Sequence, residues 1–460
     1  MTDTLIENAA SAIPITAIAA DDFDAWADGQ PEDVQIWTAS TGFTGKAGTI
    51  CLVPGAEGQL SRVLLGLPGE PGITDWAPLA TELPVGTYAL DQAPEGSDPQ
   101  DLALAWGLAQ YRFDRYKSND KGRPTLVCPD GADRVAAART VRYICMVRDL
   151  INTPAADMGP DSLAAAAESL AQEYGAAIEI TVGDDLLRDN FPAVHAVGRA
   201  NDRAPRLIDI TWGDTDAPKL TLVGKGVCFD TGGLDLKSAA GMKLMRKDMG
   251  GGAHVLGLAG MIMDAGWPVR LRVLVPAVEN SVAGNAMRPG DIVPTRKGLT
   301  IEINNTDAEG RVILADALAE AAAEDPNVII DFATLTGAAR VALGTDVPAL
   351  FCNDDTLANQ LLDASAVSKD PLWRMPLWPG YNKLVKGKFG DLNNAPDGGF
   401  GGAITAALFL EHFVEPEIPW AHFDIMAWNT SSQPGRPEGG EAMALRAVYQ
   451  ALAARFGIDG

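Results

Sequence analysis

Residues 220–237 read LTLVGKGVCFDTGGLDLK, an apolar segment that leads into a glycine-rich turn. The apolar run at its start predicts a buried strand, and the glycines that follow let the backbone approach an ion or a substrate closely. The turn carries Lys225, Asp230 and Lys237. Asp248 follows, before a helix that we expect to start after three glycines. The segment therefore predicts a polar site where a buried strand ends.

A second polar segment, NTDAEGR at residues 305–311, concentrates the acidic chemistry of the chain. Asp307 and Glu309 are two positions apart, and in an extended segment or a strand end this spacing points both carboxylates to one side. The apolar residues after Gly310 predict a buried helix. Two carboxylates, Arg311 and a glycine at a strand-to-helix turn indicate a site for a hard cation. Taken alone, the segment fits a polar turn at a helix N-terminus equally well.

Each polar residue of the first segment also has an ordinary structural interpretation. Lys225 and Lys237 could be solvated loop lysines, Asp230 could form an Asx turn and Asp248 could cap a helix. The presence of all four in this order, followed by the acidic segment, favours a metal site.

The rest of the larger part of the chain alternates predicted strands with helical stretches. Strands are expected at residues 178–181, 207–210, 220–223, 271–275 and 328–332. This alternation predicts an α/β fold with a mostly parallel sheet that helices cover on both faces. Ligands of such sheets gather at the carboxyl ends of the strands. Lys225, Asp230, Asp307 and Glu309 are all expected near such ends.

The length of 460 residues exceeds one ordinary core and predicts two domains. Residues 1–150 are expected to form a smaller α/β domain without a catalytic constellation, and residues 151–460 the catalytic domain. In the first domain, strands are predicted at residues 50–53, 62–67 and 125–128, and a helix at 101–108. A long helix over residues 133–150 is predicted to bridge the domains, and Pro154 stops it.

The composition disfavours some classes of partner and indicates the cellular compartment. The net charge of −25 disfavours nucleic acids and anionic membranes, which both need a cationic surface. No apolar run is long enough to span a bilayer, and the first residues lack the features of a signal peptide. The 5 cysteines are dispersed, which is typical of reduced thiols. We therefore expect a cytoplasmic protein.

Both polar segments resemble the signature segments of the leucyl aminopeptidase (cytosol aminopeptidase) family, which are two-metal exopeptidases. Four further segments resemble other parts of that family in the same order: residues 279–291, 331–338, 402–407 and 420–425. The resemblance extends from about Arg148 to the C-terminus. It implies a noncatalytic N-terminal domain with a role in assembly, and a homohexamer built as a dimer of trimers.

The resemblance also implies a role for each polar residue. Five residues would hold two divalent ions per subunit: Lys225, Asp230, Asp248, Asp307 and Glu309. In that scheme Asp230 and Glu309 bridge the ions, Asp307 completes the first site, and Lys225 and Asp248 complete the second. Oxygen-rich ligation without cysteine or histidine suits Mn²⁺ or Mg²⁺ and is compatible with Zn²⁺. Lys237 would stabilise the oxyanion, and Arg311 would hold a bicarbonate ion that transfers the proton.

The same resemblance assigns the pocket for the first substrate side chain to Met245, Thr334, Leu335 and Gly337. We therefore predict a metalloaminopeptidase that removes N-terminal residues, preferably leucine or another apolar residue, from peptides with a free amine. An apolar pocket separates side chains that differ by one methylene by only about 1–3 kcal/mol, so broad specificity is expected.

Two alternatives compete with this prediction. One is another two-metal hydrolase, such as one for phosphate esters, although few basic residues besides Lys237 and Arg311 could hold a phosphate. The other is a noncatalytic assembly or DNA-binding role, which some bacterial members of the family have. The intact set of ligand types and the acidic charge disfavour that role. His254 and His422 show no metal-ligand spacing and are expected in the core or at the surface.

Overall fold

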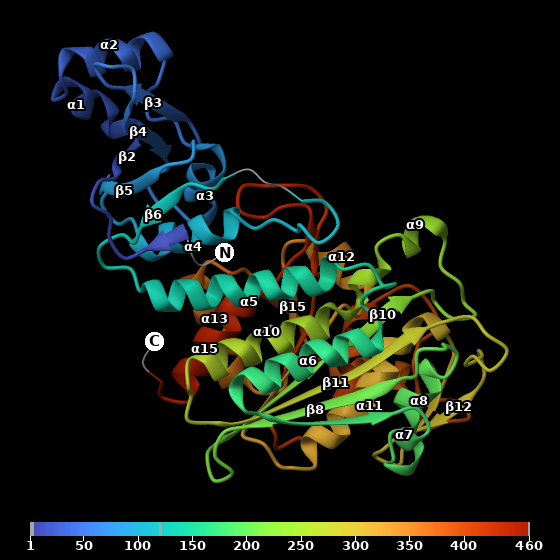
Figure 1. The fold of residues 1–460 in the computed structure, drawn as a ribbon. Helices are drawn as coiled ribbons and strands as arrows, with labels where there is room; N and C mark the ends of the chain where they lie inside the picture. The colour runs from blue at the N-terminus through green and yellow to red at the C-terminus, as the bar shows by residue number, and fades with distance from the viewer. Residues whose placement is uncertain (1–3, 119–121, 459–460) are drawn as a thin grey trace. The chain divides into compact units, whose positions relative to one another are not determined.

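The computed structural model describes residues 4–118 and 122–458, which form two compact units of an α/β protein (Figure 1). One unit contains the chain up to Cys145 together with Ser431–Glu438, and the other contains Met146–Thr430 and the chain from Gly439 onward. The long helix α5 (Arg134–Asn152) includes the boundary between them, and Thr153 and Pro154 follow its end.

The smaller unit is built on a six-stranded mixed sheet in the order β1-β6-β5-β2-β4-β3. Only β3 runs antiparallel to its neighbour within this described sheet. The strands are β1 (Leu5–Ile6), β2 (Ile13–Ala19), β3 (Ile50–Pro54), β4 (Leu60–Leu67), β5 (Thr87–Gln92) and β6 (Thr125–Val127). Its helices are α1 (Phe23–Asp28), α2 (Glu32–Thr41), α3 (Ile73–Glu82) and α4 (Pro99–Ala109). The strands and the helix predicted for this part of the sequence are confirmed.

The larger unit contains a nine-stranded, mostly parallel sheet in the order β16-β15-β18-β14-β9-β11-β8-β7, with β10 paired to β11. Antiparallel pairs occur at β11–β8, β8–β7 and β15–β18. The strands are β7 (Ala177–Val182), β8 (Arg206–Trp212), β9 (Lys219–Gly224), β10 (Gly226–Asp230), β11 (Arg270–Asn280), β14 (Val328–Ala333), β15 (Ala349–Cys352), β16 (Trp373–Arg374) and β18 (Trp420–Asp424). The predicted fold class is confirmed.

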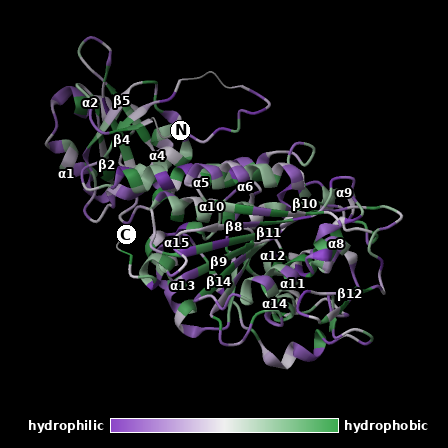
Figure 2. Cartoon of the chain, turned by 60° about the horizontal axis from the view of Figure 1, so that its bottom comes forward, coloured by the Kyte–Doolittle hydropathy of each residue, from purple (hydrophilic) through white to green (hydrophobic). Residues whose placement is uncertain are grey.

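Helices cover both faces of this sheet, as predicted. Helices α6 (Pro160–Tyr174) and α10 (Gly250–Asp264) lie on one face, and α8 (Pro192–Gly198) and α11 (Glu309–Ala322) lie on the other (Figure 1). Because both faces are covered, the central strands are hydrophobic almost throughout (Figure 2), and all six residues of β14 are buried. On the α8–α11 face, Val194, Val223, Leu274, Leu314 and Ile329 belong to one continuous core.

The remaining elements connect these layers. The helices are α7 (Asp185–Arg188), α9 (Ala239–Met242), α12 (Gly337–Leu343), α13 (Asp355–Ser368), α14 (Gly402–Glu411) and α15 (Leu445–Arg455), with 3₁₀ turns that include η3 (Met245–Met249) and η4 (Thr306–Ala308). The short strands are β12 (Ile292–Pro294), β13 (Thr300–Glu302), β17 (Leu392–Asn393), β19 (Trp428–Asn429) and β20 (Gly439–Gly440). None of the helices in the described ranges combines the length and the hydropathy needed to cross a membrane.

Two local predictions were wrong. The helix expected after the three glycines begins at Gly250, so the glycines form its first turn. A Cβ on Gly251 would lie 2.0 Å from the carbonyl oxygen of Phe332, so only glycine lets this turn pack against the end of β14. Asp307 lies in the 3₁₀ turn η4 and Glu309 begins α11, so the two residues are not in an extended segment.

We predict that Gly251→Ala destabilises the larger unit by roughly 1–3 kcal/mol, because the added methyl group forces α10 away from β14. Chemical denaturation followed by circular dichroism measures the effect. Gly284→Ala is the matched control, because Gly284 is exposed and a Cβ there has no neighbour within 4 Å. Equal stability of the two variants would contradict the close packing.

Candidate active site

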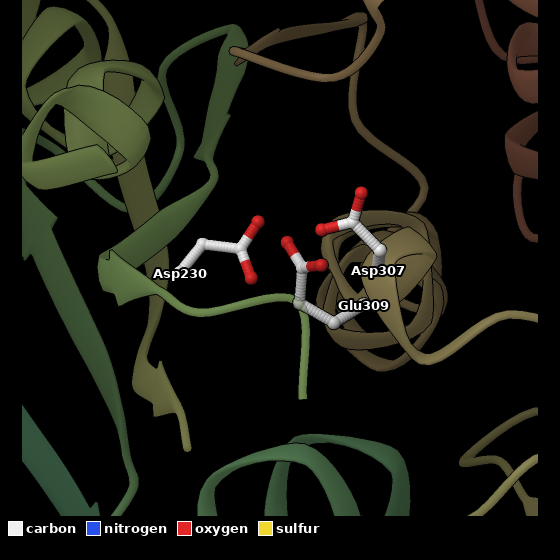
Figure 3. Close-up of side chains that lie close together, drawn as sticks. All are labelled: Asp230, Asp307 and Glu309. Carbon is white, nitrogen blue, oxygen red and sulfur yellow. The ribbon is translucent and has the colours of Figure 1, made fainter. Parts of the chain in front are cut away.

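Three carboxylates converge where β10 ends and α11 begins. Asp230 is the last residue of β10, Asp307 lies in η4, and Glu309 is the first residue of α11. One oxygen from each carboxylate lies within 4.8 Å of the others, with Asp230 opposite the other two (Figure 3). Asp230 and Glu309 are 2% and 1% exposed, whereas a third of the Asp307 side chain is accessible. Of the three carboxylates, Asp307 is therefore the one that solvent reaches.

Two lysines hold these carboxylates together with Asp248. The Nζ atom of Lys225, between β9 and β10, lies 2.7 Å from Asp248 Oδ2 and 2.9 Å from Glu309 Oε1. The Nζ atom of Lys237 lies 2.8 Å from Asp230 Oδ2 and also contacts Asp307. All seven residues predicted as metal ligands or catalytic groups lie in the larger unit, and six of them form this network.

The position after Glu309 requires a glycine, Gly310, for steric reasons. A Cβ on Gly310 would lie 2.5 Å from Cε of Lys225 and 2.7 Å from its Nζ. The absence of a side chain at this position therefore allows the lysine to reach Glu309 across the start of α11. The sequence AEGR is thus adapted to a buried lysine from the junction of β9 and β10.

Hydrogen bonds fix the orientation of the buried carboxylates. Asp230 Oδ1 accepts from Asn280 Nδ2 at 2.8 Å, and Asp248 Oδ1 accepts from the Thr334 hydroxyl at 2.7 Å. Asn280 Nδ2 also lies 3.4 Å from Glu309 Oε2. The sequence analysis did not identify Asn280 as a site residue. Asn280 can be recognised as a site residue only from the pairing of β10 with β11, which places it beside Asp230.

The pKa values reflect a dense network of opposite charges. Burial disfavours the charged form of Lys225, but the attraction of Asp248, Glu309 and Asp230 outweighs it and raises the pKa of the lysine. Burial and repulsion by Asp230 raise the pKa of Glu309 to about 8. Four carboxylates thus face two ammonium groups. This excess of acidic oxygen ligands is the donor set that divalent cations prefer.

The network opens into a cavity of about 410 Å³. The four residues predicted to form the first side-chain pocket, Met245, Thr334, Leu335 and Gly337, all line this cavity, as do Lys237 and Asp307. The sequence analysis missed two further cations in the lining, Lys247 and Arg340. Burial lowers the pKa of Lys247 to about 7, and the attraction of Asp248 only partly offsets this effect.

Arg311 also lines the cavity, apart from the lysine network. Its Nη1 donates to the carbonyl oxygen of Asn394 at 2.7 Å, while its Nε has no hydrogen-bond partner among the described residues. The side chain is 8% exposed, and burial lowers its pKa to about 10. A buried guanidinium with a free donor is suited to binding an anion.

His254 and His422, two of the 4 histidines, are core residues, one of the two placements expected for them. His254 in α10 lies with Nδ1 2.6 Å from the carbonyl oxygen of Gly250, and its Nε2 accepts from the backbone N–H of Met443. His422 in β18 lies with Nδ1 2.5 Å from Asp331 Oδ1. Both imidazoles are fully buried, and neither lines the cavity.

Comparison with known proteins identifies the family. Residues 145–449 match the catalytic domain of the cytosol aminopeptidase family, and residues 13–129 match the N-terminal domain of M17 aminopeptidases. The chain belongs to the cytosol aminopeptidase family. The predicted resemblance is therefore confirmed, and it also extends through most of the smaller unit. The protein is an aminopeptidase, a metallo-exopeptidase of the hydrolase class.

Individual relatives cover most of this aminopeptidase. It is 41% identical over 386 residues to a probable cytosol aminopeptidase of Syntrophotalea carbinolica, covering 79% of this chain and 77% of the relative. It is 42% identical to a peptidase B of Cronobacter sakazakii, over 72% of this chain and 78% of the relative.

Solved structures extend the match to nearly the whole aminopeptidase. The cytosol aminopeptidase of Coxiella burnetii superposes with a TM-score of 0.95 at 52% identity, covering 99% of this chain and all of that one. The bottromycin maturation enzyme BotP, in complex with Mn, has a TM-score of 0.87 at 32% identity, covering 97% of this chain and 100% of that one.

We predict that Lys225→Met lowers the stability of the chelator-treated aminopeptidase by roughly 3–5 kcal/mol, because Asp248 and Glu309 remain buried without their shared cation. Denaturant titration in the presence of a chelator measures the change. Lys383→Met, on an exposed turn, is the control and should change stability by less than about 0.5 kcal/mol. An unaltered midpoint for Lys225→Met would show that the lysine does not hold the cluster.

Proposed function

We propose that this aminopeptidase uses two divalent ions per subunit to hydrolyse the bond after the first residue of peptides with a free N-terminus. The observation that carries the proposal is the convergence of Asp230, Asp307 and Glu309 within 4.8 Å beside a cavity. Lys225 and Asp248 lie against the same cluster. The donors suit Mn²⁺, Zn²⁺ or Mg²⁺, and the Mn complex of BotP supports manganese.

Each ligand has a place in this scheme. Asp230, Asp307 and Glu309 would hold one ion, and Lys225 and Asp248, together with Asp230 and Glu309, would hold the other. Such ions, when bound, lower the pKa of a water ligand and polarise the scissile carbonyl. Lys225 must be neutral in order to act as a ligand, so it must release the proton that the carboxylates hold on it in the metal-free protein.

Two further cations have roles that do not require ligation. Lys237 is 16% exposed at its side chain and lines the cavity, so its ammonium can turn from Asp230 and Asp307 towards an oxyanion. Arg311 would hold a bicarbonate ion, which when bound would supply a group for proton transfer. The free Nε donor of this buried guanidinium supports that role.

The cavity wall supports a preference for leucine or another apolar first residue. Met245 and Leu335 supply apolar surface, while Gly337 leaves space for a side chain. Because such a wall discriminates by only about 1–3 kcal/mol per methylene, several first residues are accepted.

Assembly and compartment are also part of the proposal. We propose a homohexamer, as the family resemblance implies, with the smaller unit involved in assembly; light scattering coupled to gel filtration tests the mass. A cytoplasmic location is supported by the dispersed free cysteines and by the names of relatives as cytosol aminopeptidases.

The deciding experiment compares leucine-p-nitroanilide with its N-acetylated analogue on chelator-treated protein, before and after addition of Mn²⁺ or Zn²⁺. We expect metal to restore cleavage of the free-amine substrate alone. Lys237→Ala should lower kcat by roughly 10²–10³-fold, because a donor to the oxyanion is lost. Cleavage of the acetylated substrate would contradict the exopeptidase mechanism, and no cleavage with any metal would contradict the proposed activity on leucine.

A second prediction concerns Asn280, which positions two carboxylates without being a ligand. We expect Asn280→Ala to weaken Mn²⁺ binding by roughly 10–100-fold, because Asp230 and Glu309 lose the amide that orients them. Competition with a fluorescent chelator measures the affinity. Asn285→Ala, whose amide bonds an exposed loop, is the control and should bind Mn²⁺ as the unmodified protein does. Equal affinities for both variants would remove Asn280 from the site.

A further inference from the structure

Lys247 is a buried cation in the cavity wall that the proposed mechanism does not use. It lies in η3, two residues after Met245, and is 2% exposed. Within the described ranges of the chain, its ammonium makes no hydrogen bond and no ion pair. A buried charge without a partner is costly, so an unpaired ammonium at a cavity wall is a candidate for binding an anion from the substrate.

Arg340 is a second cation on the same wall. It lies in α12, three residues after Gly337, and a Cβ on Gly337 would be 3.4 Å from Arg340 Nη2. The guanidinium therefore borders the space that this glycine leaves open. Arg340 also lacks an ion-pair partner in the part of the chain that the structure describes, and it repels the charge on Lys247.

The carboxylates of the cavity form their ion pairs with other lysines. Asp230 and Asp307 are paired with Lys237, and Asp248 is paired with Lys225. Outside the cavity lining, Asp424 is already held by the Thr336 hydroxyl at 2.6 Å and by the backbone N–H groups of residues 335 and 336. Lys247 and Arg340 therefore form no ion pair with a carboxylate of the described residues.

Lys247 and Arg340 lie on the same elements as two residues of the first side-chain pocket. Lys247 and Met245 share η3, and Arg340 and Gly337 share α12. All four residues line the same cavity, so a substrate side chain in that cavity shares it with both cations. The pocket has an apolar part and a cationic part.

We propose that this pocket also accepts an acidic first residue, glutamate or aspartate, whose carboxylate binds between Lys247 and Arg340. The planar fork of Arg340 can hold both carboxylate oxygens, and Lys247 adds a compact charge from the buried side. This assignment of a substrate class rests on the proposed aminopeptidase function. It adds acidic residues to the apolar ones that Met245 and Leu335 favour.

The test compares aminomethylcoumarin amides of glutamate, glutamine and leucine on the Mn²⁺-loaded enzyme. Glutamate and glutamine have nearly the same shape, so the ratio of their kcat/KM values isolates the effect of the charge. We expect this ratio to exceed one for the unmodified enzyme. Lys247→Met should lower it roughly 10- to 100-fold, mainly through KM for glutamate, because a charge-assisted hydrogen bond is lost.

Three further variants test the assignment. Lys247→Arg should keep most of the preference, because the charge is retained. Arg340→Met should lower the ratio in the same direction, and since this residue is only partly buried it provides a test even if Lys247→Met fails to fold. Lys243→Met removes an exposed lysine outside the cavity lining and should leave the ratio unchanged.

The outcomes separate this inference from the proposed function. Cleavage of the leucine amide with a glutamate-to-glutamine ratio below one would overturn the acidic pocket and leave the aminopeptidase proposal standing. A preference for glutamate that survives in both Lys247→Met and Arg340→Met would overturn the assignment to these residues. Failure to cleave any of the three amides with any metal would overturn the proposed function, and the acidic pocket with it.

Discussion

The mutual repulsion of four carboxylates is the constraint around which the larger unit is arranged. The four carboxylates can lie together because two lysines form ion pairs with them: Lys225 with Asp248 and Glu309, and Lys237 with Asp230 and Asp307. A polar network of this kind is stable only if the surrounding framework fixes its members. The covered, mostly parallel sheet provides that framework, since the end of β10 and the first turn of α11 are buried.

Much of this arrangement was predictable from the sequence. The apolar runs marked three of the six strands of the smaller sheet and five of the nine strands of the larger one. The order of Lys225, Asp230 and Asp248 before the acidic segment indicated which residues would meet. The prediction succeeded because these signals are local: apolar periodicity, glycine-rich turns, and charged residues next to them.

What the sequence did not reveal depends on contacts between distant segments. The glycines of residues 250–252 were expected to precede a helix, but they form its first turn, where a Cβ on Gly251 would lie 2.0 Å from the carbonyl oxygen of Phe332. Asn280 has no local signature, because its importance comes from the pairing of β10 with β11. The polar character of the first side-chain pocket was missed for the same reason, since Lys247 and Arg340 lie on different elements.

The distribution of the site along the chain also constrains biosynthesis. Lys225 contacts Glu309, and Asp248 accepts a hydrogen bond from Thr334. No cation-binding cluster exists until these segments, separated by more than 80 positions, have been translated and joined. A nascent chain released before α11 therefore carries the first acidic residues without the partners that order them. Metal binding therefore follows assembly of the sheet, so the enzyme acquires its ions only after the larger unit has folded.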